Sequence, residues 1–181
     1  NDVLAVIESP EINAQRGREE AALMRLTAGV TQADAQVTIA KARLIAADAT
    51  RQQAQADEQR ADAQLTADEA EHQRIADLVK QRAVADRLLD EATNRRDAAR
   101  AAKAAVTATT AAAAAQVDVA KAQQTAAEAD LLAAKADVEV GKMRLAEVEA
   151  MLSYTELRSP FDGVVVARNV ELGDLVRNSQ N

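Results

Sequence analysis

The long stretch without glycine or proline, from Gly29 to Gly141, constrains most strongly what this chain can fold into. These two residue types mark turns and interrupt helices, so turn chemistry is confined to the two ends of the chain. Alanine, charged and amide residues fill the interval, and this mixture is typical of long helices and coiled coils. Aromatic residues make up only 1% of the 181 residues, which argues against a thick globular core. We therefore expect a mainly α protein.

Apolar residues recur at alternating spacings of three and four, the pattern of a coiled-coil seam. One series covers residues 23–47, weakens at Arg51 and Glu58, and resumes at 61–65, while a second covers 106–152. Many seam positions are alanine, so we expect two helices that approach closely and bury little area per residue. The predicted seam residues are Leu23, Leu26, Val30, Ala33, Val37, Ala40, Leu44, Ala47, Ala61, Leu65, Val106, Thr110, Ala113, Val117, Ala120, Gln124, Ala127, Leu131, Ala134, Val138, Gly141, Leu145, Val148 and Leu152.

The two ends of the chain have β-type sequences. Residues 3–7 form a short apolar run that predicts a strand, and Ser9 followed by Pro10 is typical of a helix start. The run Val164–Val166 is bracketed by Asp162-Gly163 and by Leu172-Gly173-Asp174, which predicts short strands joined by tight turns over 164–176.

The β-type ends require the helical region to reverse. Neither an isolated strand nor an isolated hairpin is stable in water, so the two pieces need each other. A straight helix of about 140 residues would hold them roughly 200 Å apart, whereas two arms on the order of 100 Å each would bring them together. Arms of equal length place the reversal near residues 80–86, within the segment RIADLVKQRAVADRLLD.

The end sequences also resemble a known family. VLAVIESPEI and LSYTELRSPFDGVVVARNVELGDLV are similar to the two half-motifs that flank the helical hairpin of periplasmic adaptor proteins, the membrane fusion proteins of tripartite efflux pumps. The resemblance implies a long antiparallel two-helix coiled-coil hairpin inserted in a small split lipoyl-like β domain. The β domain would then comprise residues 1–9 and 153–181, and the hairpin residues 10–152.

In that family the hairpin tip docks on a TolC-type outer-membrane channel through a spaced Arg-Leu-Ser-Asp pattern. Arg74, Leu78 and Asp90 match this pattern, whereas Ala85 stands in place of the serine. We hypothesise that Asp86 replaces the missing serine as the helix cap, accepting hydrogen bonds from the amides of residues 88 and 89. The resemblance thus implies partner contacts at the tip. The candidate residues are Arg74, Leu78, Lys80, Arg82, Ala85, Asp86 and Asp90.

The charge pattern separates the tip from the rest of the chain. The whole chain carries a net charge of −7, which disfavours nucleic-acid binding. Residues 74–103 hold eight basic and five acidic residues, a local excess of about three positive charges that suits either a solvated helix face or a docking surface. In the β domain, we expect Tyr154 and Phe161 to form the apolar centre. The residues expected to start the helix or shape turns are Ser9, Pro10, Pro160, Gly163 and Gly173.

Catalytic and cofactor chemistry find little support in the sequence. His72 is the single histidine and cysteine is absent, so neither a metal site nor a nucleophile–base pair can be assembled. In the adaptor family the helical hairpin replaces the turn that carries the modified lysine of lipoyl domains, so we expect no attached cofactor. We expect a protein that is not an enzyme.

We expect a periplasmic adaptor subunit of a tripartite efflux pump, most closely of the resistance-nodulation-division class, associated with the inner membrane of a Gram-negative bacterium. Such a subunit packs with further copies of itself and bridges an inner-membrane transporter to the outer-membrane channel. The chain starts at Asn1 without methionine, so we interpret it as a segment of a longer protein, with the transporter contacted by other parts. The alternatives are a type I secretion adaptor and a standalone structural coiled-coil spacer.

Overall fold

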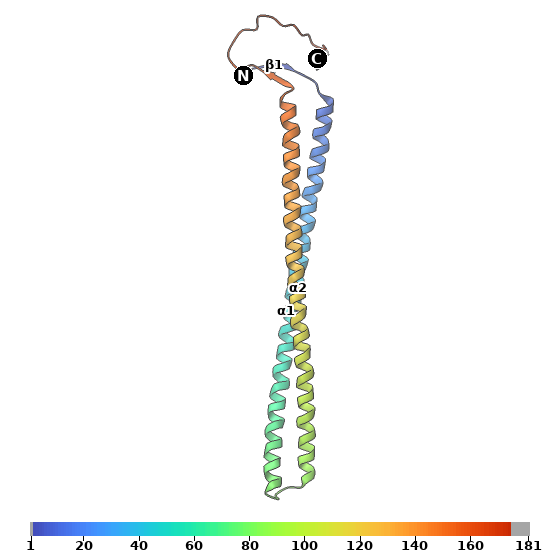
Figure 1. The fold of residues 1–181 in the computed structure, drawn as a ribbon, viewed down its shortest axis with the longest axis vertical. Helices are drawn as coiled ribbons and strands as arrows, with labels where there is room; N and C mark the ends of the chain where they lie inside the picture. Colours follow the sequence, from blue (N-terminus) through green and yellow to red (C-terminus); the bar gives the residue numbers. More distant parts are fainter. Residues whose placement is uncertain (1, 175–181) are drawn as a thin grey trace, which may run out of the picture. The chain divides into compact units, whose positions relative to one another are not determined.

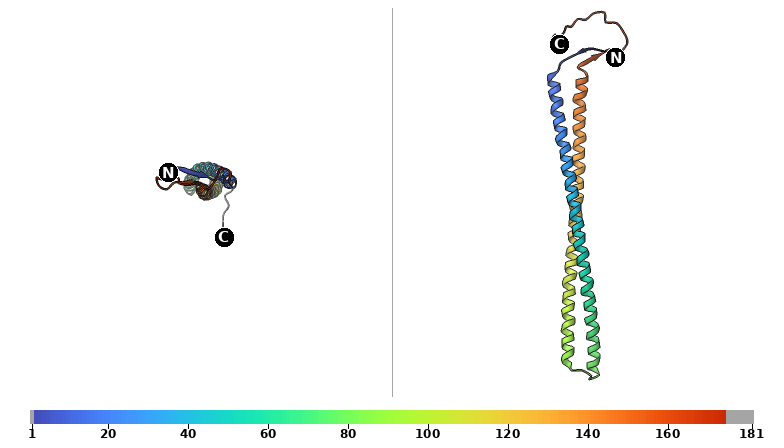
Figure 2. Two further views of the ribbon diagram at one scale, coloured as in Figure 1. Left: turned by 90° about the horizontal axis from the view of Figure 1, so that it is seen from above. Right: turned by 180° about the vertical axis from the view of Figure 1, so that it is seen from behind.

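The computed structural model describes residues 2–174, which form two long helices and two short strands (Figure 1). Strand β1 covers Val3–Val6, helix α1 covers Pro10–Lys80, helix α2 covers Asp86–Ser153 and strand β2 covers Glu156–Arg158. The two helices pack against each other as a helical hairpin, and a second view shows the same pairing (Figure 2). The prediction of a mainly α fold with two antiparallel helices is therefore confirmed.

The chain divides into two compact units, each containing part of both helices. The first unit takes in Asn1–Gln32 and Leu132–Asn181, and the second takes in Ala33–Leu131. The two strands, the start of α1 and the end of α2 belong to the first unit, whereas the turn between the helices belongs to the second. Each unit has its own section of the helix seam.

The predicted seam residues face the partner helix, since every one of them is buried or half-buried. Alanine forms much of this seam, as Ala120 illustrates with only 6% of its surface exposed. Small side chains let the helix backbones approach closely, and no large side chain of the described residues is completely enclosed. The buried apolar residues of the second unit are Val37, Ala40, Ala54, Leu65, Ala92, Ala113 and Ala120, and in the first unit Val148 is the corresponding one.

The start of α1 follows the predicted chemistry. Pro10 is the first helical residue, where its missing N–H needs no partner, and Ser9 precedes it as the cap residue. The carbonyl of Ser9 accepts the first helical hydrogen bond, from the amide of Asn13 at 3.1 Å. The helix thus begins at Pro10, where the sequence predicts its start.

The segments that flank the two helices pair in the first unit, as the reversal of the helices predicts. β1 pairs antiparallel with β2, with Val6 opposite Glu156 and Val3 opposite Arg158, and an irregularity lies between Val3 and Ala5. The ladder continues past the strands, because the amide of Ile7 donates to the carbonyl of Thr155 at 2.8 Å. The first predicted strand is thus correct to within one residue.

The predicted strands after residue 162 are wrong within the described residues. Val164–Val166 belong to no strand, the second strand lies earlier at Glu156–Arg158, and positions 175 and 176 lie outside the described part of the chain. Tyr154 is 81% exposed and Phe161 is 72% exposed, so they do not form an apolar centre. The physical reason is that a two-stranded sheet offers no second sheet against which these side chains could pack. The complete lipoyl-like domain is therefore not seen.

The remaining predicted turn residues have mixed outcomes. Gly173 has a φ of +93°, and the amide of Asp174 donates to the carbonyl of Glu171 at 3.1 Å, so the expected turn at this position is present. Pro160 lies in a bend that follows β2, and Gly163 lies just beyond that bend against the ring of Phe161.

Candidate functional site at the turn between the helices

The chain reverses within the five residues between α1 and α2. Helix α1 ends at Lys80 and α2 begins at Asp86, so the predicted reversal near residues 80–86 is confirmed. Neither glycine nor proline takes part in this turn. The reversal must therefore be built from backbone hydrogen bonds and from one residue with an uncommon backbone conformation.

That residue is Arg82, whose φ is +60° and which alone among the described non-glycine residues has a positive φ. The amide of Arg82 donates to the carbonyl of Val79 at 2.8 Å, and the amide of Ala83 donates to the carbonyl of Leu78 at 2.9 Å. These two bonds around a left-handed residue form a Schellman motif, which satisfies the last carbonyls of a helix. Glycine usually occupies the position that Arg82 takes here.

The start of α2 differs from the hypothesis for Asp86. Asp86 is already the first helical residue, so Ala85 occupies the cap position, and the carbonyl of Ala85 accepts from the amide of Leu88 at 3.1 Å. No hydrogen bond joins the carboxylate of Asp86 to the amides of residues 88 and 89 within residues 2–174. The capping hypothesis is therefore wrong, because a side chain on the first helical residue is placed beyond the free amides. Its negative charge still favours a helix N-terminus.

Most cations near the turn are neutralised by an acid on the same helix, and Arg82 differs from them. Arg82 is exposed and forms no ion pair with any residue of the described range 2–174. The hydrogen bond from Lys80, assisted by one from Gln73, holds the pKa of the Asp77 carboxyl below its ordinary value. The pairs near the turn are Arg74–Glu71, Lys80–Asp77 at 3.0 Å and Arg87–Glu91 at 3.7 Å.

The other predicted contact residues lie close to the turn without forming a single cluster of contacts. Arg74 on α1 and Asp90 on α2 are exposed, and Leu78 is half-buried on the last turn of α1. Val79 and Val84 are half-buried, which suits side chains that pack within the turn. The turn therefore presents a polar surface on which positive and negative charges are about equal in number, with Leu88 as an exposed apolar residue beside it.

Further from the turn, polar side chains of α1 and α2 contact each other within the second unit. The sequence analysis did not predict these contacts. Arg100 pairs with Glu69 at 3.3 Å, and the guanidinium of Arg96 lies 3.4 Å from Nε2 of His72. Opposite charges at positions beside the seam are the signal that could have revealed such pairs. His72 thus has a structural partner in the protein.

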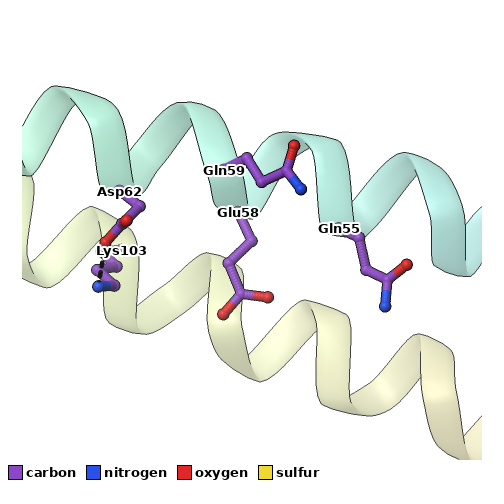
Figure 3. Close-up of a pocket in the computed structure, with 5 residues that line it drawn as sticks. All are labelled: Gln55, Glu58, Gln59, Asp62 and Lys103. Atoms are coloured by element: carbon purple, nitrogen blue, oxygen red, sulfur yellow. Dashed lines mark hydrogen bonds and ion pairs between the residues drawn. The ribbon is translucent and has the colours of Figure 1, made fainter.

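A groove of the second unit lies beside these contacts (Figure 3). Lys103 of α2 reaches Asp62 of α1, and that carboxylate raises the pKa of the lysine through a hydrogen bond and its charge. The groove is shallow and open, with one lysine against two carboxylates and two amides, and it lacks a nucleophile with an adjacent base. Its lining residues are Gln55, Glu58, Gln59, Asp62 and Lys103.

Alanines on the outer faces of both helices are a second feature that sequence reasoning missed. They recur every seventh residue on the side away from the seam and are exposed in the structure. A seven-residue repeat could have revealed this stripe in the sequence alone. On α1 it comprises Ala14, Ala21, Ala28, Ala35, Ala42, Ala49, Ala56, Ala63 and Ala70, and on α2 Ala101, Ala108, Ala115, Ala122, Ala129 and Ala136.

Residues 2–174 present neither a metal site nor a membrane span. No group of three or more histidine, cysteine, aspartate or glutamate side chains is placed to hold a metal ion. Neither α1 nor α2 contains an apolar stretch long enough to cross a membrane. Comparison of the chain with protein-family models, with curated proteins and with solved structures finds no match.

Proposed function

We propose that this protein is a periplasmic adaptor subunit of a tripartite efflux pump, most closely of the resistance-nodulation-division class. Its role is architectural and not catalytic: the helical hairpin bridges toward an outer-membrane channel of the TolC type, and the turn between α1 and α2 docks on that channel. The same subunit engages an inner-membrane transporter. The observation that carries the proposal is the glycine-free turn at 81–85 between two adaptor-like half-motifs, which exposes Arg82 without an ion pair in residues 2–174.

The pairing of the chain ends supports an inserted hairpin. In the adaptor family a β domain is interrupted by two antiparallel helices, and this requires the segments before and after the helices to meet. Here β1 precedes α1, β2 follows α2, and the two strands pair antiparallel. A coiled coil that serves only as a spacer has no need for such a pair.

The surface of the turn supports docking on a protein. Arg74 and Lys80 are exposed on the last turns of α1, and Arg82 is exposed in the turn itself. Arginine presents several N–H donors in a rigid fork, which suits backbone carbonyls and carboxylates at the end of a partner. Arg74 and Lys80 are paired with acids of α1, whereas Arg82 forms no ion pair within residues 2–174.

The outer alanine stripes support packing of several copies side by side. Small side chains at a fixed seven-residue spacing let a neighbouring helix approach closely, as the alanines of the seam between α1 and α2 already do. A ring of adaptor copies would place helices of adjacent copies against these stripes. The angle at which the helices of adjacent copies meet would set the number of copies in the ring.

Crosslinking in cells tests the docking. The chain has no cysteine, so Arg74→Cys, Leu78→Cys and Arg82→Cys each introduce a single reactive thiol in the full-length protein. We expect adducts with an outer-membrane channel from these positions and none from Ala115→Cys, an exposed position remote in sequence from the turn. Failure of all three tip positions to form an adduct with any channel would contradict the proposal.

One observation favours the standalone spacer as a second candidate. Residues 159–170 form no strand, and the exposed Val164 and Val166 lack the partner sheet that a complete lipoyl-like domain would supply. A spacer predicts that no tip position forms an adduct with an outer-membrane channel. A type I secretion adaptor predicts tip adducts as well, together with co-purification of an ATP-driven inner-membrane transporter.

A further inference from the structure

Arg82 combines two properties that are rarely found together. Its backbone is left-handed, a conformation in which the Cβ atom of an L-residue crowds the backbone, and its side chain carries a charge without an ion-pair partner in residues 2–174. Glycine would close the same Schellman motif without that crowding. The Arg82 side chain therefore contributes nothing that the turn itself requires.

The cations on either side of Arg82 in the sequence both have an acidic partner. Lys80 is held by Asp77 on α1, and Arg87 lies within reach of Glu91 on α2. Each of these acids is three or four residues away on a helix, a spacing that brings side chains together. Arg82 lies between the helices, where no such neighbour is provided, and its guanidinium remains free to bind an external group.

We propose that Arg82 determines the specificity of the turn, with its guanidinium binding a carboxylate on the surface of a protein partner. This inference rests on the proposed function, in which that partner is the outer-membrane channel. A carboxylate is the chemistry that fits, since a free guanidinium donates two parallel hydrogen bonds to it. The left-handed backbone fixes the direction in which the Arg82 side chain leaves the turn. The proposed contact with the carboxylate is therefore made in the turn between α1 and α2.

Variants that tolerate the left-handed backbone separate binding from folding. Arg82→Gly and Arg82→Asn both suit this conformation and both remove the charge. Arg82→Lys keeps a charge and loses the fork of donors. Arg95→Ala is the matched control, because Arg95 is exposed on α2 and has no ion pair within the described residues.

Binding of the purified full-length protein to the purified TolC-type channel of the same organism is measured by surface plasmon resonance. We expect Arg82→Gly and Arg82→Asn to raise Kd about tenfold or more, Arg82→Lys to raise it by a smaller factor, and Arg95→Ala to leave it within about twofold. The melting temperature of Arg82→Gly is expected to equal or exceed that of the wild type.

Each other outcome overturns the inference in a recognisable way. An unchanged Kd for Arg82→Gly means that the arginine is only tolerated in the turn, while the proposed function stands. An equal loss in Arg95→Ala means that general charge, not this residue, drives binding. A lower melting temperature for Arg82→Gly contradicts the backbone argument. Absence of wild-type binding to the channel removes the proposed function and the inference with it.

Discussion

A Cβ atom placed on Gly141 would lie 2.9 Å from Cδ1 of Leu26, closer than real carbon atoms approach. The same atom would lie 3.3 Å from Cδ1 of Leu23, so two leucines of α1 pack directly over the backbone of α2. Gly141 is buried at a seam position of the first unit. The glycine is kept in a helix interior, where it costs stability, because the helices need its missing side chain for close contact.

The substitution Gly141→Leu should lower the free energy of unfolding by about 1–3 kcal/mol, because the added side chain overpacks the seam. Gly29→Leu is the control, since nothing lies within 4 Å of a Cβ atom at Gly29. Urea unfolding followed by circular dichroism measures both. Adding Leu26→Ala to Gly141→Leu should recover part of the loss, and a loss of the same size at both glycines would contradict this packing.

Glycines with open space around them should respond in the opposite direction. Gly17→Ala and Gly29→Ala each should raise the free energy of unfolding by about 1 kcal/mol, because alanine costs less backbone entropy in a helix. Gly141→Ala should gain less, since the Leu26 side chain has to move. Urea unfolding followed by circular dichroism measures all three variants. An equal gain in stability at all three positions would show that Leu26 does not restrict the space at Gly141.

The cap position of α2 should accept an improved residue. Ala85 precedes the first helical residue and cannot accept a hydrogen bond from the free amides of the first turn. Ala85→Ser should therefore raise the free energy of unfolding by about 1 kcal/mol. Asp86→Asn tests whether the Asp86 side chain caps α2. Because it does not, the substitution should lower the free energy of unfolding only by the helix-dipole effect, a few tenths of a kcal/mol. A cost near that of a lost cap would restore the role of Asp86.

The ion pair between Lys103 and Asp62 should stabilise the fold in a defined pH range. The hydrogen bond and charge of Asp62 raise the pKa of Lys103 above its ordinary value of 10.5. A group whose pKa is raised on folding contributes stability that is fully present below the unfolded pKa and is lost as the pH rises through the folded pKa. The contribution is therefore constant at neutral pH and declines above about pH 10.5.

A double-mutant cycle of Lys103→Met and Asp62→Asn measures this coupling as a function of pH. We expect a small favourable coupling from pH 7 to pH 10, because the Lys103 side chain is 37% exposed and solvent screens the pair. The coupling should vanish in strongly alkaline solution. A coupling that grows with pH would contradict the assignment of the pair.

Much of the hairpin could be predicted from local patterns. The spacing of Leu23, Val37 and Leu65 predicts the buried face of α1, because burial at a fixed helical period depends on residues within one or two turns. The β-type ends required a reversal, and arms of equal length placed it near residues 80–86. Ser9 and Pro10 likewise predict the start of α1 from the chemistry of free amides alone.

The cap of α2 and the position of the second strand could not be predicted, because neighbouring segments of the chain compete for the same conformation. Residue types favour Asp86 as the cap of α2, since aspartate is a better cap than alanine, yet the closed turn places Ala85 at that position. Val164 and Val166 have strong strand propensity, yet strands form only where a partner strand is available. The partner of β1 proved to be Glu156–Arg158.

The sequence by itself determined the two helices, their shared seam and the place of reversal, since helical periodicity and turn chemistry act over a few residues. Only the tertiary structure decided that Leu26 packs on Gly141, that Lys103 meets Asp62, and which residue of the turn takes the strained backbone. These contacts join atoms from different helices or depend on the closure of the whole turn, so they follow from the register of α1 against α2.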